Sequence, residues 1–317
     1  MNGNIPNILV YHTSEADKYA DFLRERGVAS VQTASTPEAA LELLPGTDCI
    51  MAWRFPTELL SRPEAASVRW IQSIGAGIED LVSDPAIPRH IAITRIVDQF
   101  GGLIAEYVFA YLLLIGKELP RMMKAQSERR WSPFRVDALQ GKVIGVAGLG
   151  SIGSEIVRKA RAFDMTVYGL SFSGARASLV DRHFDGAQWL SFVKELDYLV
   201  LTLPLTEQTR QAVDRRILHA MKPEASLVNV GRGPLVSEPD LIEAMTEGRL
   251  RAAVLDVFDR EPLAPDHPFW GLPNVYVTPH LSGQSKFDAV GQFFMDNLRL
   301  FAAGEPLRGI VNRERGY

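Results

Sequence analysis

A glycine-rich segment between two apolar segments constrains the fold of this chain more than any other feature. The residues Gly148-Leu149-Gly150-Ser151-Ile152-Gly153 follow a strand-like run at 142–147, and apolar side chains recur at helical spacing over 152–163. In such a context the first glycine permits a tight turn, the second lets a diphosphate approach the backbone, and the third allows close packing of helix and strand. The helix N-terminus then faces the anion with free N–H groups. We predict a dinucleotide-binding loop with contacts at Gly148, Gly150, Ser151, Ile152 and Gly153; the alternative is a glycine-bearing turn without a ligand.

Strand-like and helix-like segments alternate on both sides of this loop. Before it, short apolar runs lie at 7–11, 49–53, 70–74 and 91–96, and after it, at 142–147, 165–170, 197–203, 226–230, 252–257 and 275–278. This alternation is typical of parallel sheets covered by helices. We therefore predict an α/β fold with two Rossmann-like, doubly wound parallel sheets, of which the second has six strands.

Two apolar helices divide the chain into domains. Residues 102–126 predict one long buried helix, and residues 286–302 predict a last helix that packs back on the first series of strands. We therefore expect a flavodoxin-like substrate domain built from 1–100 and 284–317. The dinucleotide-binding domain, 101–283, is inserted into it, with hinges near 98–102 and 282–286.

Charge and cysteine content limit the classes of function. The chain has 34 Lys and Arg, 38 Asp and Glu, and a net charge of -4, which does not favour nucleic acid or an anionic membrane as a partner. Cys49 is the only cysteine, so neither an intrachain disulfide nor a cysteine-rich metal site can form, and we expect no metal. The first residues do not resemble a secretory signal. We expect a cytoplasmic protein.

Three charged residues follow three strands of the second series. Arg232 comes after 226–230, Glu261 after 252–257 and His280 after 275–278. Ligands of open α/β sheets bind at the carboxyl ends of the strands. Each residue alone could be structural: a turn cap, a loop acid or a packed histidine. Together they fit the reduction of a carbonyl by a nicotinamide, in which His280 supplies a proton, Glu261 holds its ring, and Arg232 binds a substrate carboxylate.

The end of the second strand of this series indicates which nicotinamide nucleotide is bound. An acidic residue that binds the ribose hydroxyls of NAD usually stands there. Ser171 occupies that place, and Ser173 and Arg176 follow. Hydroxyls and a guanidinium suit a 2′-phosphate, so we predict NADP as the preferred cofactor. If Arg176 is only a solvated surface charge, NAD is accepted as well.

With these residues in view, the sequence resembles the D-isomer-specific 2-hydroxyacid dehydrogenase family, in particular its glyoxylate/hydroxypyruvate reductase branch. The segments that carry the resemblance are GLGSIG at 148–153, PLTEQT at 204–209, NVGRG at 229–233, LDVFDREPL at 255–263 and VTPH at 277–280. The resemblance implies a cytoplasmic homodimer that reduces a small 2-keto acid to a D-2-hydroxy acid. Two alternatives stay open: a dehydrogenase for bulkier 2-keto acids, and a nucleotide-sensing binding protein of the same fold.

The resemblance also implies roles for residues outside the catalytic set. In the segment SIGAGI at 73–78, the backbone amides of Gly75, Ala76 and Gly77 would hold the substrate carboxylate, although the segment could be an ordinary strand-to-helix turn. Trp131 matches a tryptophan near the substrate. Cofactor contacts are implied for Pro204, Thr209, Val230 and Asp256, the last with the nicotinamide carboxamide.

Overall fold

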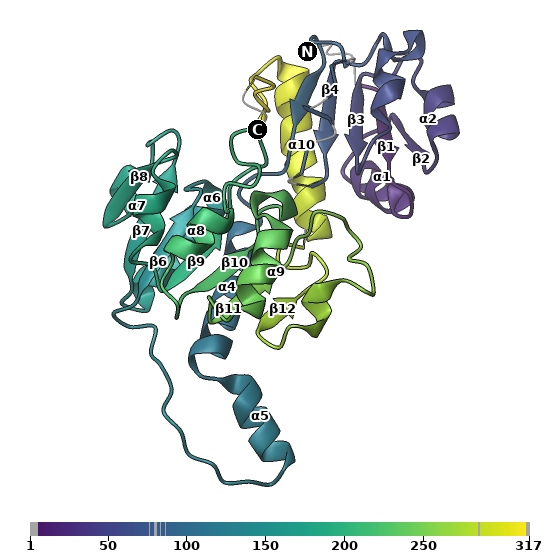
Figure 1. The fold of residues 1–317 in the computed structure, drawn as a ribbon. Coiled ribbons are helices and arrows are strands. Elements are labelled where there is room, and N and C mark those ends of the chain that lie inside the picture. Colours follow the sequence, from purple (N-terminus) through teal and green to yellow (C-terminus); the bar gives the residue numbers. More distant parts are fainter. Residues whose placement is uncertain are drawn as a thin grey trace. The chain divides into compact units, whose positions relative to one another are not determined.

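The computed structural model describes residues 6–75, 77–78, 81–82, 84–85, 87–284 and 286–314 (Figure 1). The chain forms two compact units. The terminal unit consists of Met1–Gln99 and Ser285–Tyr317, and the central unit of Phe100–Gln284. The sequence placed these boundaries one residue away, at 100/101 and 283/284.

The terminal unit is built on a five-stranded parallel sheet in the order β2-β1-β3-β4-β5. Its strands are β1 (Ile8–Tyr11), β2 (Val31–Ala34), β3 (Cys49–Ala52), β4 (Trp70–Ser73) and β5 (Ala92–Thr94). Its described α-helices are α1 (Ala16–Glu25), α2 (Pro37–Leu43) and α10 (Phe287–Ala303). This strand order is that of flavodoxin-like folds, which confirms the predicted class of this unit.

The last helix, α10, completes the core of the terminal unit, as the sequence predicted. Figure 1 shows it beside β4, and the rings of Trp70 and Phe294 stack with their centroids 4.9 Å apart. A Cβ on Gly291 would lie 2.5 Å from the Phe22 ring, so the absence of a side chain there lets α10 approach α1. Burial of these aromatic side chains joins the C-terminal segment to the N-terminal sheet.

The central unit holds a seven-stranded parallel sheet in the order β12-β11-β10-β9-β6-β7-β8. Its strands are β6 (Val143–Ala147), β7 (Thr166–Ser171), β8 (Arg182–Asp185), β9 (Tyr198–Leu201), β10 (Ser226–Asn229), β11 (Ala252–Leu255) and β12 (Val275–Val277). The order reverses between β6 and β9, which is the switch point of a dinucleotide-binding fold. The doubly wound class is confirmed, but the predicted number of six strands is wrong.

The sequence did not predict two of the strands, β2 and β8, because they are polar. β2 reads VQTA and β8 reads RHFD. β8 is an edge strand, bonded only to β7 among the described strands, so one of its faces need not be apolar and it lacks the continuous apolar run of a central strand.

Helices of the central unit flank the sheet, and the first of them is α4 (Gly101–Gly116). The others are α5 (Leu119–Ser127), α6 (Ser151–Ala162), α7 (Trp189–Val193), α8 (Arg215–Ala220) and α9 (Glu238–Thr246). Short 3-10 helices cover Thr57–Ser61 and Pro63–Ala65 in the terminal unit, and Ala177–Leu179, Gly233–Leu235 and Pro268–Gly271 in the central unit.

The single long helix expected at 102–126 is in fact two helices. Glu118, with φ of 51°, separates α4 from α5. Pro120 explains the break, because a proline has no N–H to donate and its ring clashes with the carbonyl four residues earlier. That carbonyl, of Gly116, instead accepts a hydrogen bond from the Asp137 amide at 2.9 Å.

Residues 118–136 form an excursion from the central unit, here called the arm, which contains α5 (Figure 1). Hydrogen bonds hold the two ends of the arm close to each other. The Arg251 guanidinium donates to Asp137 Oδ2 at 2.6 Å and to the Ile115 carbonyl at 3.1 Å. Lys117 Nζ donates to the Asp137 carbonyl at 2.7 Å. The arm therefore has a fixed root.

Within the described ranges, none of the helices combines the length and the apolar content that crossing a membrane requires.

Candidate active site

The glycine loop occupies the turn between β6 and α6. A Cβ on Gly148, whose φ is 102°, would lie 2.8 Å from Thr202 Oγ1, and one on Gly153 would lie 1.8 Å from the Gly148 carbonyl oxygen. These two positions therefore require glycine for packing. A Cβ on Gly150, in contrast, would meet nothing within 4 Å. Gly150 faces open space at the start of a helix, which is where a diphosphate needs access to the backbone.

The start of α6 has the donors that such a group requires. The first hydrogen bond of the helix runs from the Ser154 amide to the Gly150 carbonyl at 2.9 Å. The amides of Ser151, Ile152 and Gly153 precede it and have no acceptor within the helix. The loop thus fits the diphosphate of a dinucleotide, with the packed glycines inside and the accessible amides outside.

Other predicted cofactor contacts lie at the carboxyl ends of neighbouring strands. Pro204 and Thr209 belong to the loop after β9, in which Thr209 Oγ1 donates to the Pro204 carbonyl at 2.7 Å and accepts from the Thr206 amide at 2.8 Å. Thr209 is thereby the residue that shapes this loop. Val230, directly after β10, is buried.

His280 and Glu261 form a direct pair. His280 Nδ1 lies 2.8 Å from Glu261 Oε2, and Glu261 Oε1 accepts a hydrogen bond from the Phe258 amide at 3.1 Å. His280 follows β12 and Glu261 follows β11, which are neighbours in the sheet. Because an ionised carboxylate only accepts hydrogen bonds, the proton of this contact sits on Nδ1, and Nε2 is left for other chemistry.

Arg232 lies on the loop after β10, the next strand of the same sheet. A Cβ on the following residue, Gly233, would lie 1.9 Å from the Phe258 carbonyl carbon. The Arg232 loop is therefore in contact with the backbone segment that holds Glu261. Arg232 Nη1 donates to the Gly231 carbonyl at 2.7 Å. The three residues selected from the sequence thus lie on adjacent loops at the same sheet edge.

Asp256 organises the loop that carries His280. This fully buried carboxylate accepts hydrogen bonds from Thr278 Oγ1 at 2.5 Å and from the amides of Leu281 and Ser282, both at 2.9 Å. Its carbonyl accepts the His280 amide at 3.0 Å. These contacts hold His280 at a φ of 51°, in a region that costs a non-glycine residue about 1 kcal/mol or more.

The same loop is also tied to α4. The hydroxyl of Tyr107 lies 2.7 Å from Thr278 Oγ1. Burial raises the pKa of Tyr107 above its usual value, and the nearby Asp256 carboxylate acts in the same direction. Tyr107 therefore stays protonated over the physiological range and serves as a hydrogen-bonding group.

Glu238 supports the segment 259–261, which carries Glu261. The Asp259 amide donates to Glu238 Oε1 at 2.9 Å, and His267 Nε2 lies 3.5 Å from Glu238 Oε2. Burial raises the pKa of Asp259, and the negative charge of Glu238 adds to this effect.

The ribose end of the loop contains a contact that the sequence did not reveal. Ser171, at the end of β7, is buried, and its Oγ lies 2.8 Å from Nε2 of His183 on β8. Arg176 donates to the Leu149 carbonyl at 3.2 Å and to Ser154 Oγ at 2.9 Å, so its guanidinium reaches the glycine loop. Ser173 accepts weakly from the Ala175 amide at 3.4 Å.

The segment SIGAGI belongs to the terminal unit. The Gly75 amide donates to Ser73 Oγ at 3.3 Å, and Ser73 Oγ donates to the Gly77 carbonyl at 3.2 Å. A Cβ on Gly75 would lie 2.4 Å from the Trp53 ring, so this glycine is required for packing. Ala76, the middle residue of the predicted carboxylate loop, lies outside the described residues.

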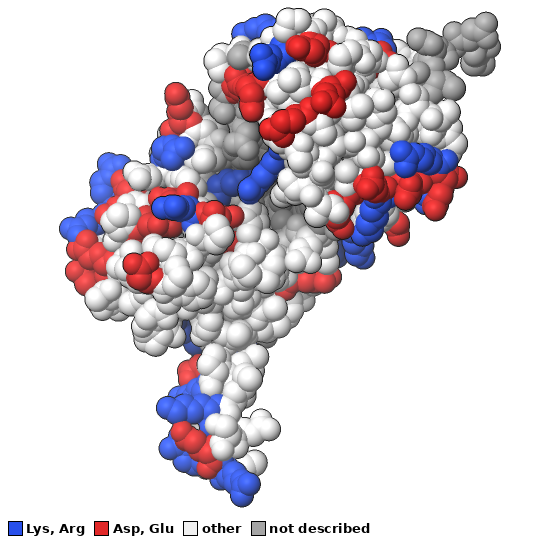
Figure 2. All heavy atoms as spheres, turned by 90° about the vertical axis from the view of Figure 1, so that its right-hand side faces the viewer, with Lys and Arg blue, Asp and Glu red and all other residues white. Residues whose placement is uncertain are grey.

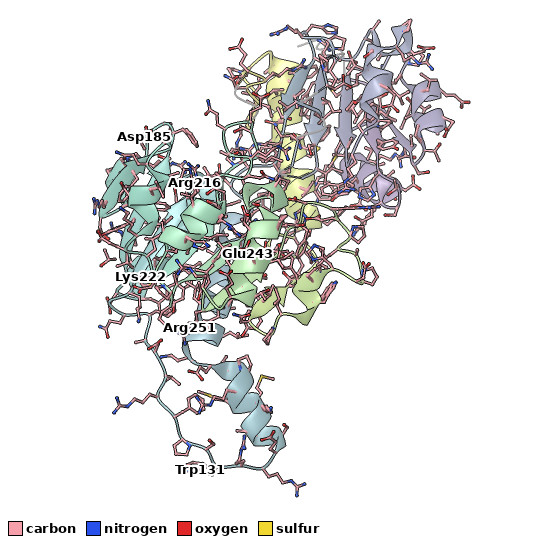
Figure 3. The ribbon with its side chains drawn as sticks, viewed as in Figure 1. Trp131, Asp185, Arg216, Lys222, Glu243 and Arg251 are labelled. Atoms are coloured by element: carbon pink, nitrogen blue, oxygen red, sulfur yellow. The ribbon has the colours of Figure 1, made fainter. Side chains whose placement is uncertain are left out.

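Trp131 is carried away from the other predicted residues of the central unit. Figure 3 shows it at the tip of the arm and Arg251 at the root. Its side chain is 95% exposed. Among the residues that the structure describes, Trp131 has no partner that would explain a tryptophan, and it does not contact the His280 loop.

Three residues that shape the site were not singled out from the sequence: Asn229, Thr278 and His183. The Asn229 side chain accepts the Gly231 amide at 3.1 Å and donates to the Arg232 carbonyl at 2.8 Å, which fixes the Arg232 loop. Asn229 and Thr278 stand inside segments that the resemblance already used. His183 lies on the polar strand β8, and only its position beside Ser171 draws attention to it.

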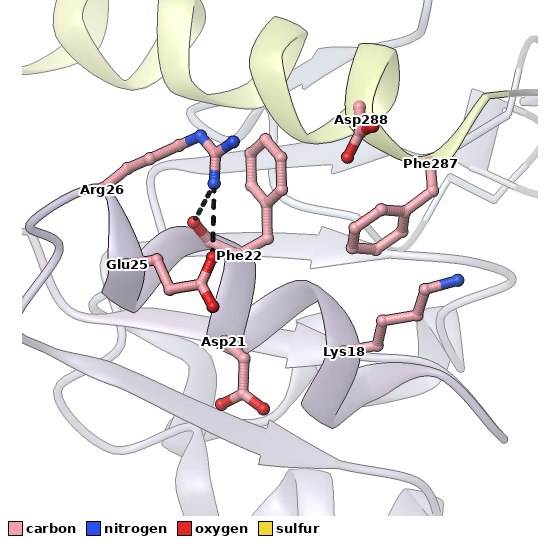
Figure 4. A pocket seen from close by; sticks show the side chains of 7 residues that line it. All are labelled: Lys18, Asp21, Phe22, Glu25, Arg26, Phe287 and Asp288. Carbon is pink, nitrogen blue, oxygen red and sulfur yellow. Dashed lines mark hydrogen bonds and ion pairs between the residues drawn. The ribbon is translucent and has the colours of Figure 1, made fainter.

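A shallow pocket lies elsewhere in the terminal unit, between α1 and the start of α10 (Figure 4). Arg26 packs over the Phe22 ring at 3.4 Å and donates to the Phe22 carbonyl at 3.1 Å, while Lys18 lies over the Phe287 ring at 4.3 Å. These cations are engaged with rings and backbone, and the pocket contains none of the predicted site residues. Among the described residues, no group of His, Cys, Asp and Glu is arranged to hold a metal ion.

Several known proteins are similar to this chain over most of its length. The glyoxylate reductase of Pyrococcus furiosus is 32% identical over 79% of this chain and 77% of its own length. D-3-phosphoglycerate dehydrogenase of Methanocaldococcus jannaschii is 29% identical over 92% of this chain, which spans only 56% of that protein. The crystal structure of NADPH-dependent glyoxylate/hydroxypyruvate reductase from Sinorhizobium meliloti, in complex with NADP and sulfate, has a TM-score of 0.88. The reductase is 27% identical to this chain, and the match covers 98% of this chain and 100% of the reductase chain.

A family match covers the central unit almost completely. Residues 109–282 match the family described as D-isomer specific 2-hydroxyacid dehydrogenase, NAD binding domain. This segment includes the glycine loop and the three strand-end residues. The chain belongs to the D-isomer specific 2-hydroxyacid dehydrogenase family of NAD(P)-dependent oxidoreductases.

Proposed function

We propose that this protein reduces a small 2-keto acid, of the glyoxylate or hydroxypyruvate type, to the D-2-hydroxy acid with NADPH. The observation that carries the proposal is the 2.8 Å contact between Glu261 and His280 at the carboxyl edge of a dinucleotide-binding sheet. A histidine whose ring is held by a carboxylate at one nitrogen can give a proton to a substrate from the other nitrogen.

The catalytic roles follow from the hydrogen-bond directions. When bound, the nicotinamide nucleotide supplies the hydride. His280, with Nδ1–H donated to Glu261, presents Nε2–H in its protonated form and gives that proton to the developing alkoxide oxygen. Glu261 stabilises the positive ring and then the neutral tautomer that remains. Without such a donor the negative charge on the alkoxide oxygen would not be neutralised as it forms. His280 therefore lowers the barrier to reduction.

Substrate orientation is assigned to Arg232 and to backbone amides. The guanidinium of Arg232 has the planar geometry that binds a carboxylate and polarises an adjacent carbonyl. Asn229 fixes its backbone, which limits the positions that the side chain can reach. Amides of Gly75, Ala76 and Gly77 are proposed as further contacts of the substrate carboxylate, on the resemblance of SIGAGI to the family's segment.

The preference for NADPH is supported by the ribose end of the site. No carboxylate stands at the end of β7, where it would repel a 2′-phosphate. Ser171, Ser173 and Arg176 are there instead, and the Arg176 guanidinium reaches the glycine loop. The structurally similar reductase from Sinorhizobium meliloti is described as NADPH-dependent. Asp256, Val230, Pro204 and Thr209 are proposed as contacts of the nicotinamide half.

A homodimer is proposed from the arm. Met123 is 69% exposed and Trp131 95% exposed, which is costly for apolar side chains on a projecting segment. Figure 2 shows basic and acidic side chains together on the projecting lower part, and Arg121 pairs there with Glu118 and Arg130 with Glu128. A second copy that covers the arm would bury the side chains of Met123 and Trp131. The buried single cysteine fits a cytoplasmic location.

The test is a panel of 2-keto acids assayed with NADPH and with NADH. We expect the highest kcat/KM with glyoxylate or hydroxypyruvate and NADPH, and a D-configured product by chiral chromatography. A preference for an aromatic or branched 2-keto acid would refute the assigned substrate class. Nucleotide binding without turnover of any member of the panel would refute the enzymatic function and favour a nucleotide-sensing role.

A further inference from the structure

Glu238 binds the backbone of the loop that carries Glu261. It is the first residue of α9, and its Oε1 accepts a hydrogen bond from the Asp259 amide at 2.9 Å. The helix itself is anchored, because three of its side chains are buried in the core of the central unit. A carboxylate on an anchored helix thus holds the chain two residues before the carboxylate that binds His280.

The peptide group between Phe258 and Asp259 is also held from a second side. A Cβ on Gly233 would lie 1.9 Å from the Phe258 carbonyl carbon and 2.5 Å from the Asp259 nitrogen, so the Gly233 backbone packs directly against this peptide group. The preceding amide, that of Phe258, donates to Glu261 Oε1 at 3.1 Å. One packing contact and two hydrogen bonds therefore hold this loop, and Glu238 accepts one of the two.

The other oxygen of Glu238 lies beside His267. The Phe269 amide donates to His267 Nδ1 at 3.3 Å, and because an amide can only donate, the proton of the neutral ring is on Nε2. Nε2 lies 3.5 Å from Glu238 Oε2. The side chain of Glu238 is only 16% exposed and that of His267 20%. Glu238 thus has a neighbour at each carboxylate oxygen, which restricts its position.

We propose that Glu238 is a positioning residue for catalysis, which fixes the peptide before Asp259 and thereby the orientation of Glu261. This inference rests on the proposed reduction of a 2-keto acid. If the Asp259 amide loses its acceptor, the peptide can rotate and Glu261 follows its backbone. The Nε2 atom of His280 then no longer points to a fixed place. Small displacements of a reacting group lower the rate strongly, so the effect should fall on kcat.

Two substitutions separate the hydrogen bond from the charge. Glu238→Ala removes the acceptor of the Asp259 amide, and we expect kcat to fall by about tenfold, with the KM of the keto acid and the dissociation constant of NADPH unchanged. Glu238→Gln removes the charge but keeps an oxygen that can accept from this amide, so most of kcat should remain. The matched control is Glu247→Ala, which removes a charge at the exposed end of the same helix and should leave kcat unchanged.

Double variants test the route through Glu261. A structural role elsewhere would cost the same factor in any background, whereas residues that act as a unit show non-additive effects. In Glu261→Gln, which no longer stabilises the charged ring of His280, the addition of Glu238→Ala should lower kcat by less than about twofold more. In Arg232→Lys the same addition should again cost about tenfold, because the coupling is with Glu261.

Hydrogen exchange measures the effect without turnover. The Phe258 amide reports on the loop because it binds Glu261 Oε1 and is not itself the amide that Glu238 accepts. Its protection should fall by about tenfold in Glu238→Ala, and it should be unchanged in Glu238→Gln and in Glu247→Ala. If Glu238→Ala does not fold, Glu238→Asp serves instead, since it keeps an acid at the start of the helix but is one carbon shorter.

The outcomes separate this inference from the proposed function. If the unaltered protein reduces no 2-keto acid, the proposed function fails and the inference fails with it. If the protein is active and the loss of the Glu238 hydrogen bond changes neither kcat nor the exchange of the Phe258 amide, the inference alone fails. Equal losses in Glu238→Ala and Glu238→Gln would show that the charge acts. A full tenfold loss in the Glu261→Gln background, about 1.4 kcal/mol, would show a route that does not pass through Glu261. Either result overturns the inference.

Discussion

Glu261 is held on both carboxylate oxygens, Oε2 by His280 Nδ1 at 2.8 Å and Oε1 by the Phe258 amide at 3.1 Å. The second contact matters because a carboxylate fixed by its own backbone cannot rotate freely to follow the imidazole. The histidine is therefore positioned by Glu261, and the orientation of its Nε2 is a property of the folded loop.

Replacement of His280 by Gln should remove the proton donor and leave the nucleotide site intact. We expect kcat to fall by about 10²–10⁴-fold, the usual contribution of general acid catalysis. Steady-state kinetics give kcat, and fluorescence titration gives the dissociation constant of NADPH, which should not change. Unchanged turnover in this variant would remove His280 from the mechanism.

Replacement of Glu261 by Gln tests the tautomer. A glutamine amide can donate a hydrogen bond to Nδ1, which favours a neutral ring whose only proton is on Nε2. The positively charged ring that gives the proton in the proposed mechanism is then no longer stabilised. We expect kcat/KM to fall by about 10²-fold, while Glu261→Asp, which keeps the charge but is shorter, should lie between Gln and the unaltered enzyme. A Gln variant as active as the Asp variant would contradict the assigned role.

Arg232→Lys retains a positive charge but loses the planar fork. We expect kcat/KM for the keto acid to fall by about 10²-fold, with a larger fall for Arg232→Ala, because bidentate contact to a carboxylate is lost in both. The matched control is Arg260→Ala, since Arg260 is exposed and directly precedes Glu261. Equal losses at positions 260 and 232 would point to general electrostatics instead of a specific contact.

Asp256→Asn should weaken the loop that carries His280. An asparagine retains one acceptor oxygen, whereas Asp256 uses both oxygens for three donors. We expect the free energy of unfolding to fall by about 2 kcal/mol, since a buried donor is left unsatisfied. Urea unfolding measures this change, and Asp266→Asn, at an exposed position, is the control. A variant of unchanged stability would show that the carboxylate does not hold the loop.

The parts of the fold that were predictable share a physical cause. Strands buried on both faces, such as β6 and β10, are continuous apolar runs. The rule that ligands bind at the carboxyl ends of such strands then selected Arg232, Glu261 and His280 from the sequence alone. β8 was missed because an edge strand tolerates Arg182 and His183. The contacts of Asn229, Thr278 and His183 were not predictable, because they depend on which loops meet at the sheet edge and not on any local pattern.

The extent of the arm illustrates a second limit. The apolar pattern of α4 continues past Gly116, and Pro120 alone did not indicate whether the helix kinks or ends. The answer lies in Asp137, Lys117 and Arg251, which are far apart in the sequence and tie the two ends of the arm together. Local periodicity contains no information about that closure.

The root of the arm should loosen at acidic pH. The hydrogen bond from Arg251 lowers the pKa of Asp137 below its usual value of 3.8, against a smaller opposing effect of burial. A carboxyl whose pKa is lower in the folded state contributes stability that is fully present above its unfolded value and is lost as the pH falls through the folded value. The clamp should therefore be intact from neutral pH down to about 4 and weaken below it.

Hydrogen exchange can follow this loosening at the Asp137 amide, which donates to the Gly116 carbonyl at 2.9 Å. Its protection should fall below about pH 4 in the unaltered protein, and Asp137→Asn should show the low protection already at pH 7, by a modest factor because the side chain is partly exposed to solvent. Arg251→Met should match Asp137→Asn, since each removes the same ion pair. If protection of this amide stays constant through the acid range and in both variants, the arm is fixed by the backbone contact alone and the ion pair plays no part in it.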